Sequence, residues 1–237
     1  LLYTPGDNDW TDCDGRAGGS YNPLERLDKL RKVFFGRPGV TLGQRPMRVG
    51  SQAGAGFPEN VTWKMANVTF SMVHIVGGNN GLIPWAGHTT ATPQQTAEVM
   101  ARVAADVQQI HDAFRSARRS GSRAVVLMTQ ADMFGSPPSS ARFATRYGFQ
   151  AIVQAFSREA RRYRKPVYLF SGDSHTYRRG NPLAPGSPWL RLYHVAPVPK
   201  LTRYVVEGST HDDEWLKVAV HANGPRVITT RRVAFDG

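Results

Sequence analysis

The sequence predicts an α/β protein whose strands are at least partly parallel. Between residues 92 and 170, segments with helical periodicity alternate with short, continuous apolar runs. Such runs are typical of strands buried on both faces, and the helices between them imply crossover connections. The chain has 237 residues, of which 41% are hydrophobic and 20% are charged. We therefore predict one domain over residues 1–237, with enough apolar side chains for a core.

Two helices are predicted from their start signals. Asn22 can cap a helix that has Pro23 at its first position and Glu25 completing a capping box. Thr92 begins a second helix with the same arrangement. Apolar residues then recur at helical spacing in both segments: Leu24, Leu27, Leu30 and Phe34 in the first, and Val99, Val103, Val107, Ile110 and Phe114 in the second. A third helix is expected from about 140 to 164, interrupted near Gly148 and ended by Pro166.

Strands are predicted along the whole chain. The first is the end of a strand at residues 1–3, and a tight turn at Ala66-Asn67 joins the next two. The full set comprises 1–3, 61–65, 68–76, 124–128 and 167–170, followed by a more antiparallel C-terminal sheet of 190–195, 202–206, 215–220 and 226–230.

Polar clusters follow four of these strands. They are Gly6-Asp7-Asn8-Asp9, Gly77-Gly78-Asn79-Asn80, Thr129-Gln130-Ala131-Asp132 and Ser171-Gly172-Asp173-Ser174-His175. Each cluster alone can be an ordinary turn or cap. Because the carboxyl ends of strands form the edge of an α/β sheet at which sites are built, we expect the four to meet there. Asp, Asn, Gln and His without Cys suit divalent ions such as Mg, Mn, Fe or Zn.

The motifs "PGDND", "VGGNNG" and "SGDSHTY", in that order, resemble those of the calcineurin-like metallophosphoesterase superfamily. The resemblance runs from residue 2 to about 220. It implies a four-layer α/β/β/α sandwich of two mixed sheets flanked by helices, and a two-metal site that hydrolyses phosphate esters. The family's first motif, Asp-x-His, has no counterpart in the chain, so the expected fold is N-terminally shortened.

The resemblance also implies roles for individual residues. One or two divalent ions (Mn, Fe, Zn or Mg) are expected, with Asp7 as the bridging carboxylate. The expected metal ligands are Asp7, Asn79, Gln130, Asp173 and His175, and the register leaves Asn79 and Asn80 interchangeable. Asn80 and His175 are the expected catalytic residues. Arg178 and Arg179, just past His175, can offer bidentate hydrogen bonds to a substrate phosphate.

The predicted function is metal-dependent hydrolysis of a phosphomonoester or phosphodiester by an activated water. A catalytically weak or inactive binding protein of the same fold is one alternative. A basic nucleic-acid-binding protein or nuclease, using residues 115–119 and 158–165, is another, since the net charge is +12. A phosphorylated small molecule is the expected partner. No apolar run is long enough to cross a bilayer, and the sequence leaves the oligomeric state and the compartment open, whether soluble, secreted or periplasmic.

Overall fold

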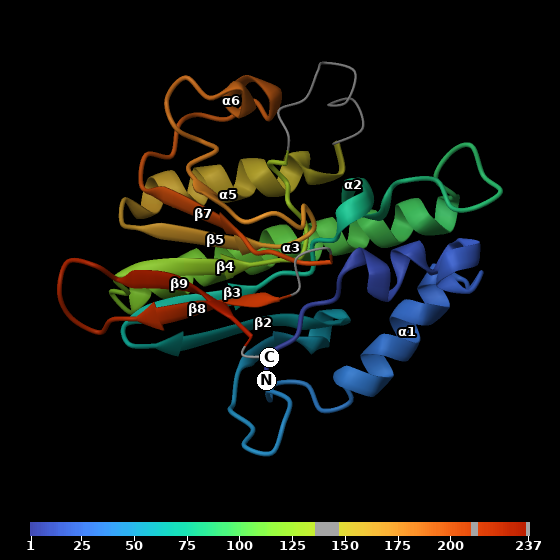
Figure 1. The fold of residues 1–237 in the computed structure, drawn as a ribbon, viewed down its shortest axis with the longest axis horizontal. Coiled ribbons are helices and arrows are strands. Elements are labelled where there is room, and N and C mark those ends of the chain that lie inside the picture. Colours follow the sequence, from blue (N-terminus) through green and yellow to red (C-terminus); the bar gives the residue numbers. More distant parts are fainter. Residues whose placement is uncertain (136–146, 210–212, 236–237) are drawn as a thin grey trace.

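A seven-stranded mixed sheet forms the centre of the computed structural model, which describes residues 1–135, 147–209 and 213–235. The strand order is β1-β2-β3-β4-β5-β7-β6. Helices α3 and α5 cover one face of the sheet, and a two-stranded hairpin, β8-β9, covers the other (Figure 1). Among the described residues, no helix is both long and apolar enough to span a membrane.

The sheet is parallel in the middle and antiparallel at its edges. Strands β3 (Val68–Met72), β4 (Ala124–Met128), β5 (Val167–Ser171) and β7 (Leu201–Val205) run parallel. Strands β1 (Gly50–Gln52) and β2 (Phe57–Met65) are antiparallel at one edge, and β6 (Arg178–Gly180) is antiparallel at the other. The predicted parallel pairing with helical crossovers is thus confirmed.

Five helices are described, and the cap signals located two of them. They are α1 (Pro23–Phe34), α2 (Gly77–Gly81), α3 (Pro93–Arg119), α5 (Gln150–Tyr163) and α6 (Pro188–Leu192). Asn22 Oδ1 caps α1, but Glu25 binds Arg26 instead of completing a capping box. Thr92 and Gln95 form a full capping box at α3. Of the predicted third helix, residues 140–146 lie outside the described residues, and α5 begins after a short turn at Tyr147–Phe149.

Two hydrophobic clusters lie on opposite faces of the sheet, because successive apolar side chains of its central strands point to alternate faces. Val125 and Leu127 of β4 face the cluster under α3 and α5, whereas Ala124 and Val126 face the hairpin cluster. This explains the continuous apolar run that the sequence shows at β4. A third, smaller cluster joins Leu27 of α1 to Trp10 and Val76.

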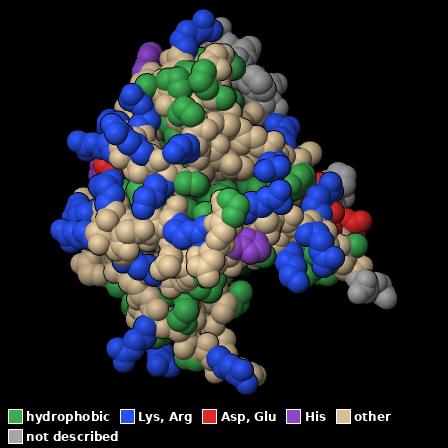
Figure 2. All heavy atoms as spheres, turned by 90° about the vertical axis from the view of Figure 1, so that its left-hand side faces the viewer, with side chains coloured by type: hydrophobic (Ala, Val, Ile, Leu, Met, Phe, Trp, Pro, Cys, Tyr) green, Lys and Arg blue, Asp and Glu red, His purple; other side chains and the backbone are tan. Residues whose placement is uncertain are grey.

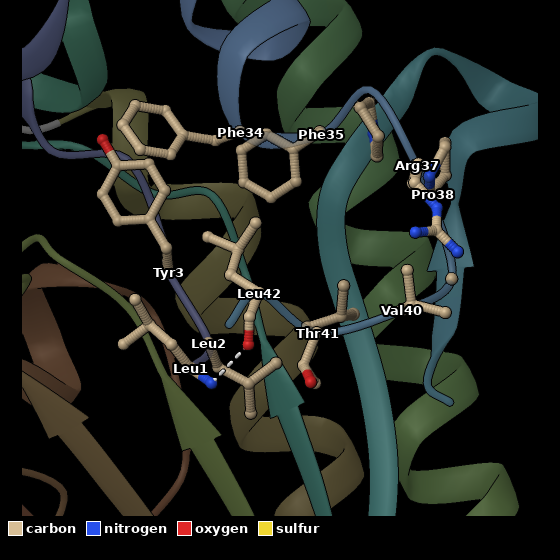
Figure 3. Close-up of a pocket in the computed structure, with 13 residues that line it drawn as sticks. Leu1, Leu2, Tyr3, Phe34, Phe35, Arg37, Pro38, Val40, Thr41 and Leu42 are labelled. Carbon is tan, nitrogen blue, oxygen red and sulfur yellow. Dashed lines mark hydrogen bonds between the residues drawn. The ribbon is translucent and has the colours of Figure 1, made fainter. Parts of the chain in front are cut away.

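Residues 1–3 do not form a strand, contrary to the prediction. Leu1 exchanges two backbone hydrogen bonds of 2.8 Å with Leu42, but Pro5 lacks an amide hydrogen and no ladder develops. Tyr3 instead packs its ring against Phe34 and Phe35, with centroids 4.8 and 6.0 Å apart (Figure 3). The cavity in this apolar corner measures about 20 Å³, which leaves room for about one water molecule.

The predicted C-terminal sheet is also wrong in part. Residues 190–195 are not a strand, because Ser187 and Pro188 begin helix α6, which packs Trp189 against Phe134. Strand β7 joins the main sheet in parallel with β5. Only β8 (Glu214–Val220) and β9 (Ile228–Ala234) form the expected separate antiparallel layer. The described residues therefore form an α/β protein with one mixed sheet and a hairpin.

Candidate functional site

Side chains from two strand exits and the N-terminal segment meet at the carboxyl edge of the sheet, beside the backbone of Gly77 at a third exit. We call Asp7, Gln130, Asp173 and His175 the edge cluster. Gln130, after β4, donates through Nε2 to Asp7 Oδ1 at 2.9 Å. Its Oε1 accepts from the amide of Gly77, after β3, at 2.7 Å. Parallel strands β4 and β5 deliver Gln130 and Asp173 to one edge, whereas Asp7 is carried by a segment that is not a strand and is anchored by buried Trp10.

The carboxylates of Asp7 and Asp173 share the space beside Gly77. A Cβ atom on Gly77 would lie 1.9 Å from Asp7 Oδ2 and 2.7 Å from Asp173 Oδ1. These two oxygens are therefore no more than about 5 Å apart, the sum of the two distances. The site needs glycine at this position because a side chain would displace both acids.

The environment of Asp7 disfavours its negative charge. Burial is the largest cause that raises the pKa of Asp7, and the charge of Asp173 raises it further. The amide of Asn8 and the nearby His175 lower the pKa but do not cancel these effects. Such an arrangement favours a proton or a cation between the two carboxylates.

Asp132 positions Asp173 in the edge cluster. The amide of Asp132 donates to Asp173 Oδ2 at 3.1 Å. Its own buried carboxylate accepts from Ser174 Oγ at 2.6 Å and from Arg203 Nη1 at 2.7 Å. Asp132 follows β4 two residues after Gln130, which was a usable signal for its role. Arg203 lies in β7, which was predicted to belong to another sheet, so its role was missed.

Asn79 and Asn80 are engaged away from the edge cluster. Asn79 Oδ1 accepts from the amide of Gly148 at 3.1 Å. The fully buried Asn80 donates to the carbonyl of Gly148 at 3.1 Å and accepts from Arg102. Both amides therefore hold the turn that follows β3, and the structure does not bring them together with Asp7 and Asp173.

Four non-glycine residues near this edge have left-handed backbones. The φ angles are 57° at Asn79, 61° at Asn80, 67° at Asp173 and 53° at His175. This conformation is uncommon outside glycine and persists only where surrounding contacts enforce it. Clustered strain of this kind is typical of functional sites.

Arg178 and Arg179 lie in β6, where successive side chains point to opposite faces. Burial is the main cause that lowers the pKa of the Arg203 guanidinium. The charge of Arg178 lies close enough to lower this pKa further. Arg179 instead stacks over Tyr204 on the hairpin face, at 5.7 Å from the ring centroid. The two arginines predicted to bind one phosphate are therefore separated by the sheet.

A second polar cluster, which we call the buried network, lies between β2, β3 and α3. It consists of Glu59, Asn60, His74, Arg102 and Asp106, all buried. His74 Nδ1 lies 2.8 Å from Glu59 Oε1, and Arg31 also binds Glu59, at 2.6 Å. Burial lowers the pKa of His74, so the neutral ring donates to Glu59.

In the part of the chain that is described, no three or more His, Cys, Asp or Glu side chains form a group able to hold a metal ion. Oxygen ligands for a cation are nevertheless present in the Asp7–Asp173 pair. Gln130 directs its oxygen to Gly77, so it orients Asp7 rather than adding a ligand. Searches of family models, curated proteins and solved structures find no match to this chain.

Proposed function

We propose that this protein is a metal-dependent hydrolase of phosphate esters with a calcineurin-like sandwich fold. In this proposal the β8-β9 hairpin corresponds to the second sheet of that four-layer fold. One divalent ion binds between Asp7 and Asp173. The observation that carries the proposal is the approach of these two carboxylates beside the bare backbone of Gly77, together with the raised pKa of Asp7.

The carboxylate pair fits a divalent cation. Ions of the Mg, Mn or Ca type take oxygen ligands at roughly 2.0–2.6 Å, so one ion can bind two oxygens that are up to about 5 Å apart. A cation also replaces the repulsion between Asp7 and Asp173 by attraction. A bound divalent ion lowers the pKa of water toward neutrality and offsets the charge of phosphate oxygens.

The surrounding residues have supporting roles in this proposal. Gln130 and Asp132 hold Asp7 and Asp173 in place through the hydrogen bonds described above. His175 is half-buried beside Asp7, where its imidazole can donate a proton to a leaving oxygen. Arg178 adds positive charge on the same side as Arg203. Asn80 acts indirectly, by holding the turn after β3, because its side chain is buried.

Calorimetric titration of Mn²⁺ into the protein, together with turnover of an aryl phosphate and an aryl phosphodiester, tests the proposal. We expect Mn²⁺ to bind and to support turnover, and Asp7→Asn and Asp173→Asn to abolish both. Asp28→Asn, which removes an exposed carboxylate on α1, is the matched control. Absence of Mn²⁺ binding to the unaltered protein, or equal binding to Asp7→Asn, would refute the proposal.

A weakly active or inactive binding protein is the second candidate. It is favoured by the observation that the described residues supply two carboxylates but no group of three His, Cys, Asp or Glu ligands. One bound Mn²⁺ without turnover of either ester supports this candidate, whereas metal-dependent turnover supports the hydrolase.

A further inference from the structure

A cavity of about 600 Å³ opens between the main sheet and the hairpin. It lies on the face of the sheet to which Arg179 points, opposite the face of Arg178. Strands β5, β6, β7 and β9 and the loop before β9 form its walls. Its main polar lining residues are Tyr168, Arg179, Thr202, Tyr204, Arg226 and Thr229. The volume falls within the range of cavities that bind small organic ligands.

The lining is rich in cations and hydroxyl groups. Two guanidinium groups, two phenols and the threonines Thr202 and Thr230 line the cavity, and none of its described lining residues is a carboxylate. The hydroxyl of Thr229 is instead engaged with His221 Nε2 at 2.8 Å. Neither Arg179 nor Arg226 forms an ion pair with another described residue, unlike Arg31, Arg102 and Arg203. The end of the molecule drawn in Figure 2 likewise shows many Lys and Arg side chains and very few acidic ones. The uncompensated charges favour an anion in the cavity.

The walls are held in place by bonds within the chain. Arg123 donates to the carbonyls of His221, at 2.7 Å, and Gly224 in the loop between β8 and β9. Tyr204 stacks on Phe170 with centroids 4.9 Å apart, and Arg179 stacks over Tyr204. The guanidinium of Arg179 is therefore already oriented before a ligand arrives, which reduces the entropy lost on binding.

The hydroxyl of Tyr168 faces the same positive charges. Burial is the main cause that raises the pKa of Tyr168, and the neighbouring Tyr204 raises it further. The pKa is lowered by the backbone of Ile228 and by the charges of Arg179 and Arg123. The phenol of Tyr168 thus lies within the same positively charged surroundings as the cavity arginines, and its hydroxyl can donate a hydrogen bond to a ligand oxygen.

We propose that this cavity is a binding site for a small organic phosphate, separate from the edge cluster. The phosphoryl group is bound by Arg179 and Arg226 with help from the Tyr168 and threonine hydroxyls. The organic part, a nucleoside or a sugar, occupies the remaining space against Tyr204. Guanidinium groups suit this ligand because they form bidentate bonds to phosphoryl oxygens.

Calorimetric titration with AMP, in EDTA and at moderate salt, tests this site independently of the proposed metal. We expect the unaltered protein and Asp7→Asn to bind AMP equally, and adenosine to bind at least tenfold more weakly. Arg179→Gln combined with Arg226→Gln is expected to weaken AMP binding by at least 30-fold. Arg231→Gln, which removes an exposed arginine of β9, is the matched control and is expected to change binding less than twofold.

Three results would overturn the proposal: no AMP binding, equal binding of adenosine and AMP, or equal weakening by the double variant and Arg231→Gln. Circular dichroism and the unfolding temperature check that the double variant is folded. If it is not, Tyr168→Phe serves instead and is expected to weaken AMP binding about threefold. An unchanged affinity of Tyr168→Phe for AMP would then overturn the proposal. Failure of Mn²⁺ binding at Asp7 would refute the proposed hydrolase but leave this result unaffected.

Discussion

The edge cluster and the buried network are built from similar residues, but they shift the pKa of one carboxylate each, Asp7 and Glu59, in opposite directions. In the buried network, Glu59 lies between His74 and Arg31, and its pKa falls to about 2 although burial alone would raise it. In the edge cluster, Asp7 lies beside another carboxylate and its pKa rises. The network therefore compensates its glutamate charge within the chain, whereas the edge cluster favours a proton or a cation taken from solution.

Arg102 connects the two regions. Its guanidinium binds Glu98 Oε1 at 2.8 Å, the carbonyl of Asn80 at 2.9 Å and the carbonyl of His74 at 3.3 Å. It also binds the side chain of Asn80. The buried network thus supports the strained turn that places Gly77 under Asp7 and Asp173. We therefore expect changes in the buried network to affect mainly stability, and changes in the edge cluster to affect mainly the proposed metal binding.

The largest effect is expected from Arg102→Met. Removing this cation takes the buried ionic partner from Glu98 and one hydrogen-bond partner from Asn80, so the free energy of unfolding should fall by about 3–5 kcal/mol. Urea unfolding measures the loss. Arg115→Met, at an exposed ion pair with Asp112 on the same helix, should cost less than about 1 kcal/mol. Similar losses in the two variants would contradict the role given to Arg102.

Asp106→Asn is expected to raise stability in a pH-dependent way. Burial raises the pKa of Asp106 from 3.8 to about 8, so the folded state retains a proton that the unfolded state releases above about pH 4. The stability that this proton provides is present below pH 4 and is lost as pH rises toward 8, by up to about 1.4 kcal/mol per pH unit. The asparagine variant lacks this loss and keeps the bond to Asn60.

Urea unfolding at several pH values between 4 and 8 tests the Asp106 prediction. The difference between Asp106→Asn and the unaltered protein should grow with pH. The control Asp112→Asn, on the exposed face of α3, should show a constant difference. Parallel pH curves for Asp106→Asn would show that Asp106 is ionised in the folded protein.

Gly77→Ala is expected to separate the two acids of the edge cluster. Its methyl group would lie 1.9 Å from Asp7 Oδ2, so Asp7 must move, at a cost of about 1–3 kcal/mol of stability. Mn²⁺ affinity should fall at least tenfold in calorimetry. Gly54→Ala is the control, because its methyl group would meet nothing within 4 Å. Unchanged Mn²⁺ affinity in Gly77→Ala would argue against a metal between the two acids.

The smallest effect is expected from Asp7→Asn in the absence of metal. Removing one of two repelling carboxylates should raise the free energy of unfolding by less than about 1 kcal/mol at pH 7, since solvent screens this half-exposed group. Added Mn²⁺ should raise the unfolding temperature of the unaltered protein but not of the variant. A variant that is clearly less stable without metal would mean that Asp7 has a structural role.

Local signals predicted much of the fold because they act within a few residues. The caps at Asn22 and Thr92 correctly located α1 and α3, and the Ala66-Asn67 turn correctly joined β2 to β3. The error at 190–195 arose because an apolar run was given more weight than the Ser187-Pro188 helix start. The strand predicted at 1–3 failed because pairing depends on a partner strand that a local pattern does not show.

The sequence by itself determined the types of residue at the strand exits and the parallel order that brings Gln130 and Asp173 to one edge. Only the tertiary structure decided which groups the polar side chains contact. Asn80 is buried against Arg102, and Asp132 gains a partner 71 positions away in Arg203. Arg178 and Arg179, adjacent in sequence, lie on opposite faces of the sheet. Burial and charge compensation depend on which segments pack together, and no spacing within a single segment specifies them.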